Sequence, residues 1–197
     1  MAILGIAGSV ALLAGWRLYL SIFATGLAMR FDVVPLPEHL RSLEVLADPW
    51  VLSIAGIAAV VEFFADKVMW LDSIWDAVHS FVRPIGGALL ALAILDPSDP
   101  ATQVIAFLLG GGATLASHVG KAGTRAMVNT SPEPVSNVVV STAEDIATAG
   151  LLYTAFEYPQ VAAAIAAVLA VVVIGLLVAA RNIIRRLFGG QKPGARV

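Results

Sequence analysis

Residues 61–90, VEFFADKVMWLDSIWDAVHSFVRPIGGALL, place ionisable side chains within a stretch that is otherwise apolar. A charge at the centre of a bilayer costs about 2.5 to 3.5 kcal/mol on insertion scales, so such residues usually face a protein interior or a water-filled path. The stretch carries Glu62, Asp66, Lys67, Asp72, Asp76, His79 and Arg83. Their placement is therefore the main sequence guide to function.

The whole chain has the composition of an integral membrane protein. Of its 197 residues, 59% are hydrophobic and 13% are charged, and the mean hydropathy is +0.88. Such values are untypical of soluble domains. The length accommodates about six spans of roughly 20 residues each. We predict an all-α, polytopic transmembrane bundle, with one domain over residues 1–188 and a basic tail over 189–197.

Six apolar runs are separated by polar or proline-rich segments. They cover about 3–29, 50–68, 84–95, 101–116, 135–156 and 161–180. The first is interrupted at Gly15, Trp16 and Arg17, and we expect it to be a retained first helix because no basic residue precedes it. The third is too short to cross about 30 Å of hydrocarbon alone. Either the amphipathic piece before it enters the membrane too, or this span is a broken or re-entrant helix.

The distribution of Lys and Arg predicts that both termini are cytoplasmic, because positively charged loops stay inside. In that orientation the outer loops hold Arg30 and Arg41, and the inner segments hold nine basic residues. The nine are Lys67, Arg83, Lys121, Arg125, Arg181, Arg185, Arg186, Lys192 and Arg196.

A shift of 95 residues suggests an internal repeat. It aligns Gly15 with Gly110, Arg30 with Arg125, Pro37 with Pro132 and Glu38 with Glu133. Halves of three spans each, over 1–95 and 101–188, would have opposite orientations. Transporters built from such inverted repeats bind their substrates near the interface between the repeats.

Two acidic pairs in separate spans form the predicted ion site. Glu62 and Asp66 are four residues apart, and Glu144 and Asp145 are adjacent near the middle of a later span. Carboxylates in a low dielectric can share a proton or bind a hard cation, so these four are also the candidate metal ligands. Lys67 lies beside the first pair, and the alternative is that basic residues only neutralise that pair at the membrane boundary.

His118, Lys121 and Arg125 form a cationic stripe, because they are spaced by three and four residues. Such a stripe could hold an anionic substrate group or a lipid phosphate. The alternative is that the basic residues reach toward lipid headgroups. His118 titrates near neutral pH, which makes it a candidate proton relay.

A polar stripe crosses the fifth predicted span. Asn137, Ser141, Glu144 and Thr148 recur every three or four residues, with Asp145 beside them. A stripe of this length on a membrane helix predicts that its face lines the bundle interior.

One predicted helix face has two interpretations; it is formed by Asp72, Asp76, His79 and Arg83. Spacings of four, three and four place all four on one side of a helix. That side belongs either to a helix on the membrane surface or to an inner gate.

The segments VEFFADKVMWLDSIWDAVHSFVRPIGGALL, ASHVGKAGTRAMVNTSPEPVSN and STAED together resemble a bacterial family of small polytopic membrane proteins, domain of unknown function 4126. The resemblance covers nearly the whole chain. It implies a bacterial inner-membrane protein and supplies no activity. Gly15, Trp16 and Arg17 depart from the smaller, more neutral sequence expected there.

These observations favour a transporter that moves a cation or small solute coupled to protons, and not an enzyme. One alternative is a carrier or scramblase for anionic lipid that uses Lys67, Arg83, Lys121 and Arg125. A weaker alternative is a membrane enzyme acting on lipid phosphate through Asp72, Asp76 and His79. The expected partners are the lipid bilayer, a small ion or solute and a second copy of the chain, with no nucleic acid. We expect no cofactor, and a divalent cation only as substrate.

Overall fold

The computed structural model describes residues 2–31, 44–95, 98–128 and 134–188. Apart from a 3₁₀ turn at 44–47, the regular structure in these ranges is α-helical, which confirms the all-α class. The helices are α1 (Ala2–Trp16), α2 (Leu18–Arg30), α3 (Pro49–Ala65), α4 (Met69–Leu95), α5 (Pro100–Val128), α6 (Pro134–Glu157) and α7 (Pro159–Phe188). The predicted basic tail, 189–197, lies outside the described residues.

Proline marks the start of four of these helices. α3, α5, α6 and α7 each begin at a proline, which suits the first helical position because no intrahelical N–H is needed there. The Asp48 carboxylate caps α3 by accepting from the Trp50 N–H at 2.8 Å. Asp99 accepts from the N–H and the hydroxyl of Thr102 at the start of α5, and these bonds hold the pKa of the Asp99 carboxyl below its ordinary value.

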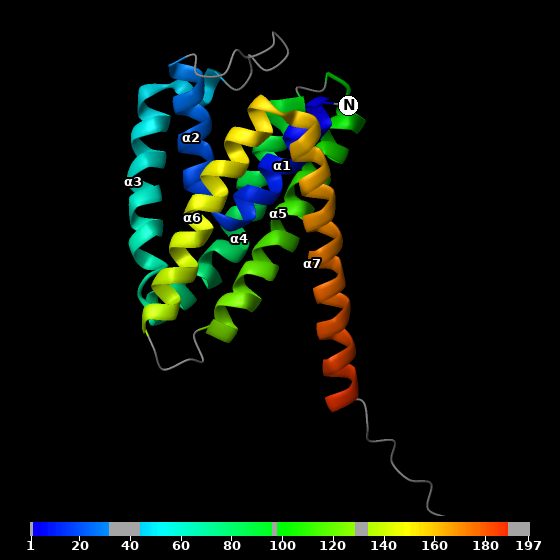
Figure 1. Cartoon of the computed structure of the whole chain (residues 1–197). Helices are drawn as coiled ribbons and strands as arrows, with labels where there is room; N and C mark the ends of the chain where they lie inside the picture. The colour runs from blue at the N-terminus through cyan, green and yellow to red at the C-terminus, as the bar shows by residue number, and fades with distance from the viewer. Residues whose placement is uncertain (1, 32–43, 96–97, 129–133, 189–197) are drawn as a thin grey trace, which may run out of the picture.

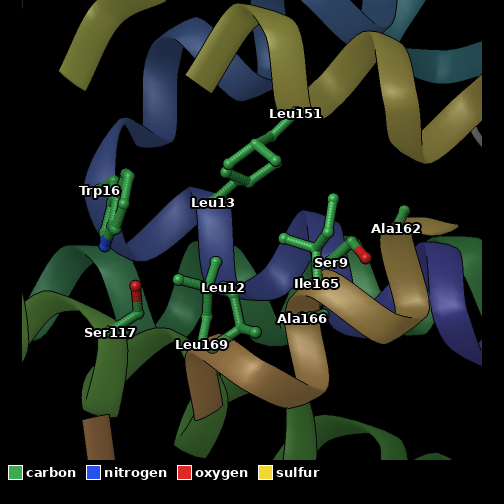
Figure 2. A pocket seen from close by; sticks show the side chains of 10 residues that line it. All are labelled: Ser9, Leu12, Leu13, Trp16, Ser117, Leu151, Ala162, Ile165, Ala166 and Leu169. Carbon is green, nitrogen blue, oxygen red and sulfur yellow. The ribbon is translucent and has the colours of Figure 1, made fainter. Parts of the chain in front are cut away.

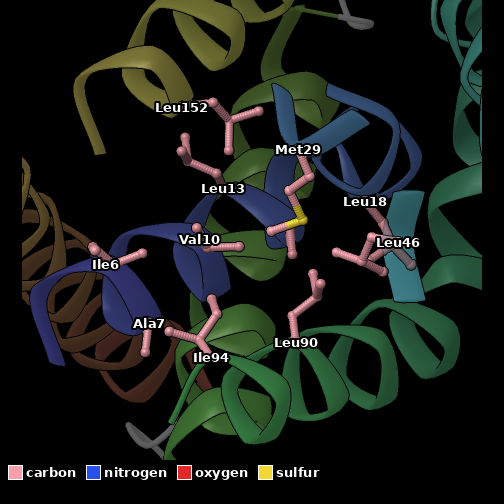
Figure 3. Packing of buried hydrophobic residues seen from close by; sticks show 11 residues of the cluster. Ile6, Ala7, Val10, Leu13, Leu18, Met29, Leu46, Leu90, Ile94 and Leu152 are labelled. Atoms are coloured by element: carbon pink, nitrogen blue, oxygen red, sulfur yellow. The ribbon is translucent and has the colours of Figure 1, made fainter. Parts of the chain in front are cut away.

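α1 and α2 form a helical hairpin that enters the bundle and returns to the same end. Ile6 near the start of α1 and Met29 near the end of α2 share one apolar cluster with Ile94 at the end of α4 (Figure 3). Between them, Gly15 lies against Thr114 and Ser117, about halfway along α5. The chain turns back at Arg17, whose φ of −142° and ψ of 80° interrupt the helix. The first apolar run is therefore a broken helix pair and not the single helix that we expected.

α4 is one continuous helix of 27 residues that contains Pro84. Its first part is the amphipathic piece and its second part is the short apolar run, so this region is not the broken helix of the second alternative. The broken helix lies at residues 2–30 instead. Two helices of the described part, Met69–Leu95 and Pro100–Arg125, are long and apolar enough to cross a membrane by length and composition.

The hairpin also changes the expected positions of the termini. α3 to α7 alternate in direction along the bundle, so the start of α1 and the end of α7 lie at opposite ends (Figure 1). If the long axis of the bundle crosses a membrane, this arrangement does not favour the prediction that both termini are cytoplasmic; the position of the membrane itself stays a prediction. Lys67, Arg83, Lys121 and Arg125 were counted as loop charges, but they contact carboxylates within the bundle.

The 95-residue shift pairs α3 with α6 and α4 with α7, and each pair runs in opposite directions (Figure 1). The first elements differ, because the hairpin α1–α2 is broken at Arg17 whereas α5 is unbroken. The two halves are therefore not equivalent in shape. Pro37 and Glu38 of the aligned pairs lie outside the described residues.

Candidate functional site

A buried ion network fills the bundle below the turn of the hairpin. It brings together charged residues from the hairpin turn, from both sides of the α3–α4 turn and from α4, α5 and α6. We define it by its charged members: Arg17, Glu62, Asp66, Lys67, Asp72, Asp76, Arg83, Lys121, Arg125, Glu144 and Asp145. His79, His118, Asn137 and Ser141 lie within or beside it. Every predicted site residue therefore lies in this region.

Arg17 is the member that the sequence reasoning left without a role. Its side chain is 1% exposed, and its guanidinium pairs with the carboxylate of Asp66. It also lies 3.0 Å from an oxygen of Asp145 and 3.6 Å from Glu144, and it donates to the backbone oxygen of Ser141 at 3.0 Å. One arginine thus joins the two predicted acidic pairs. The only sequence signal was a single charge inside an apolar run.

Asp66 is the second centre of the network, because it ends α3 with both its carboxylate and its carbonyl occupied. Lys121 Nζ lies 2.8 Å from the carboxylate that Arg17 also contacts. The Asp66 backbone oxygen accepts from the Arg125 guanidinium and from Asn137 Nδ2. Cations favour the carboxyl end of a helix, where carbonyl groups lack partners. The predicted cationic stripe therefore binds protein groups here.

Glu62, Arg83 and Asp76 form an arm of the network between α3 and α4. Arg83 lies 2.8 Å from Glu62 and 3.0 Å from Asp76, and both Glu62 and Arg83 are fully buried. Arg83 also donates to the carbonyl of Gly15 at 3.4 Å. A buried ion pair needs such further hydrogen bonds to offset desolvation.

His118 is held in one tautomer by this arm. Its Nδ1 lies 2.6 Å from Arg83 Nη1, which can only donate, so Nδ1 accepts. Its Nε2 then carries the proton, and the carbonyl of Asp76 lies 3.1 Å away as the acceptor. A second proton would have to bind Nδ1, where the positive charge of Arg83 would repel it. These contacts support an uncharged, positioning histidine and do not favour the predicted proton relay.

The four predicted gate residues of α4 share one face and are all buried. Arg125 lies 3.1 Å from Asp72, and His79 bonds the Tyr19 hydroxyl and the Trp75 carbonyl. These contacts place the face inside the bundle, where it joins α4 to α3, α5 and the hairpin. Its role as a gate stays a prediction.

Glu144, Asp145 and Lys67 form the outer part of the network. Their side chains are 14%, 18% and 16% exposed, whereas most other members are nearly inaccessible. Lys67 lies 3.5 Å from Asp145 and stacks over the ring of Phe63. Glu144 lies 3.6 Å from Arg17 and 3.9 Å from Lys121, and its buried Oε2 accepts no hydrogen bond.

Glu144 also lines a side opening of about 410 Å³ between α5, α6 and α7. Lys121, Thr124 and Trp16 also line this opening. The network holds six carboxylates and five Lys or Arg side chains, so with neutral histidines its formal charge is one negative. One proton or one monovalent cation would neutralise it.

The four predicted metal ligands do not gather around one point. Arg17 lies between Asp66, Glu144 and Asp145, and Arg83 occupies Glu62. Within the described ranges, no group of three or more His, Asp or Glu side chains is arranged to hold a metal ion. The arrangement favours proton chemistry over chelation of a divalent cation.

The family of domain of unknown function 4126 (DUF4126) matches residues 4–179, so the chain belongs to this family. The match includes the hairpin and every member of the ion network. No curated protein and no solved structure matches the chain.

Proposed function

We propose that this member of the DUF4126 family is a proton-coupled membrane transporter in which Glu144 carries the exchangeable proton. The observation that carries the proposal is that Glu144 is the one carboxylate of the ion network that lines the side opening. Its buried Oε2 accepts no hydrogen bond, so a proton can bind it without breaking one. Groups that are poised in this way are candidates for functional proton exchange.

The membrane placement of the proposal has two supports. α4 and α5 have the length and composition of membrane spans. The outward faces of α3 and α4 expose large apolar side chains, which a lipid environment would cover: Ile54, Ile57, Phe64, Ile74, Phe81 and Ile85. In this placement α3 to α7 cross the bilayer while α1–α2 enters and returns. Five basic residues follow position 180, which favours a cytoplasmic end for α7.

Coupling follows from the charge balance of the network. When Glu144 is ionised, the network is one charge negative and attracts a cation into the side opening. When Glu144 is protonated, the network is neutral and that attraction disappears. Arg17 and Lys121, each shared between Glu144 and Asp66, can then move toward Asp66. Such a shift links the proton to the turn of the hairpin.

The contacts favour neither alternative function. A lipid phosphate needs cations that are free to bind it, and each of the five network cations already contacts a carboxylate. An enzyme acting through Asp72, Asp76 and His79 needs those groups at a substrate cavity. They are instead packed against Arg125, Arg83 and Tyr19.

The test uses proteoliposomes that contain a pH indicator and carry an imposed pH gradient. Panels of alkali cations, divalent cations, amines and zwitterions are added, and solute-dependent proton movement is recorded. We expect movement with wild type and with Glu157→Gln, an exposed change on the same helix. We expect none with Glu144→Gln. Infrared difference spectra between high and low pH should lose a protonated-carboxyl band in Glu144→Gln. Unchanged proton movement and spectra in that variant would refute the proposal.

A further inference from the structure

The side opening is amphipathic, and its composition points to a class of substrate. Its walls carry apolar groups from α6 and α7, including Val140, Leu169 and Val172. Its lining also includes Glu144, Lys121 and Trp16. A volume of about 410 Å³ is within the range of small-molecule sites, which are mostly apolar with a few polar groups.

A second, tight apolar cavity adjoins the opening between α1, α6 and α7. Its lining shares Trp16, Ser117 and Leu169 with the opening, and its other wall residues include Leu12, Leu13 and Ile165 (Figure 2). Its volume is about 30 Å³, which is too small for more than a short apolar substituent. The apolar surface of the opening therefore continues into this cavity.

The charges around Glu144 select the sign of the ligand. Arg17 from the hairpin turn and Lys121 and Arg125 from α5 face it, together with Asp66 from the end of α3 and Asp145 from its own helix. Each of these cations also contacts another carboxylate. Without Glu144, the network has five carboxylates and five Lys or Arg side chains, so ionised Glu144 adds the one excess negative charge at the side opening. The indole ring of Trp16 adds a surface that attracts cations.

We infer that the substrate class is an organic cation with apolar substituents, such as a hydrophobic amine or quaternary ammonium, that exchanges with the proton on Glu144. The inference rests on the proposed function and specifies its substrate. The protonated carboxyl group of Glu144 releases its proton as the cation arrives, and the carboxylate then pairs with the cation. The total charge of the network and ligand is conserved in this exchange. Apolar substituents lie against Leu169 and Val172.

The experiment measures binding of tetraphenylphosphonium to purified protein in nanodiscs, with empty nanodiscs subtracted. Tetraphenylborate, which has nearly the same shape and the opposite charge, is the matched ligand control. We expect saturable binding of the cation to wild type, with release of a proton into weakly buffered solution. Glu144→Gln should weaken the affinity at least about tenfold, a loss of about 1.4 kcal/mol. Glu157→Gln should bind like wild type. Trp16→Phe should weaken binding less than Glu144→Gln does, because a phenyl ring retains part of the cation–π attraction.

Two outcomes would overturn the inference. One is equal or tighter binding of tetraphenylborate, which would identify an anion site around Lys121. The other is unchanged affinity for the phosphonium in Glu144→Gln. If either occurs while Glu144→Gln still abolishes solute-dependent proton movement, the proposed function stands and only the substrate class is wrong. If that proton movement persists in Glu144→Gln, the proposed function itself fails.

Discussion

Replacing Arg17 with glutamine removes the cation that joins both acidic pairs of the network. Arg17 contacts Asp66 and lies 3.0 Å from Asp145 and 3.6 Å from Glu144. At an effective dielectric constant of about 20, each of the latter two pairs has a gross attraction of about 5 kcal/mol. Desolvation of the ions cancels much of this, but removing one partner of a buried pair still costs about 3–5 kcal/mol, because it leaves an uncompensated charge. We therefore expect Arg17→Gln to lower the free energy of unfolding by about 3–5 kcal/mol.

The assay is unfolding in mixed micelles of dodecyl maltoside and increasing SDS, followed by tryptophan fluorescence. Arg30→Gln is the matched control, because Arg30 is exposed and donates only to the Ala47 carbonyl among the contacts described. It should change stability by less than about 0.5 kcal/mol. In a double-mutant cycle, Asp145→Asn should be less destabilising in the Arg17→Gln background, with a coupling of about 0.5–3 kcal/mol. Equal stabilities of Arg17→Gln and Arg30→Gln, or zero coupling, would refute the reasoning.

Three further predictions concern the hairpin, a helix start and the histidine. Gly15→Ala should lower unfolding stability by about 1–3 kcal/mol through overpacking, since its Cβ would lie 2.8 Å from Ser117 Cβ. Gly112→Ala, where a Cβ meets nothing within 4 Å, is the control, and equal losses would contradict the close approach. Asp48→Ala should cost about 1 kcal/mol in the same unfolding assay by removing the cap of α3, and no loss would argue against that cap. Nitrogen NMR at pH 7 should show His118 neutral and protonated at Nε2; a charged ring would contradict the tautomer assignment.

The sequence predicted which residues lie in the site better than it predicted which acidic side chain contacts which cation. Spacings of three and four residues identified the face of α4 that carries Asp72, Asp76, His79 and Arg83, and the structure buries all four. The pairing could not be predicted, because it depends on how helices that are distant in sequence pack. Arg17 lies 49 residues from Asp66, and 127 and 128 residues from Glu144 and Asp145 of α6. The sequence alone gave no reason to connect them.

The hairpin was not predicted, because hydropathy does not distinguish one straight apolar helix from two shorter apolar helices that fold back on each other. Residues 3–29 have the length of a single span, and no proline breaks them. The cause of the break lies in tertiary structure. Gly15 permits close approach to the α5 backbone, and Arg17 finds its carboxylate partners only below the turn. Local propensity favours an unbroken helix here, and ion pairing in the bundle overrides it.

The broken backbone and the buried cations stabilise each other. A helix break inside an apolar bundle leaves carbonyl groups without intrahelical donors, which is costly away from water. Arg83 donates to the carbonyl of Gly15, and Lys121 donates to that of Trp16 at 3.2 Å. Arg83 and Lys121 thereby gain uncharged acceptors in addition to their carboxylate partners. In the proposed function, a change in the charge of Glu144 acts on Lys121 and, through Lys121, on the carbonyl of Trp16 at the hairpin turn. The turn of α1–α2 is therefore the element that we expect a proton on Glu144 to move.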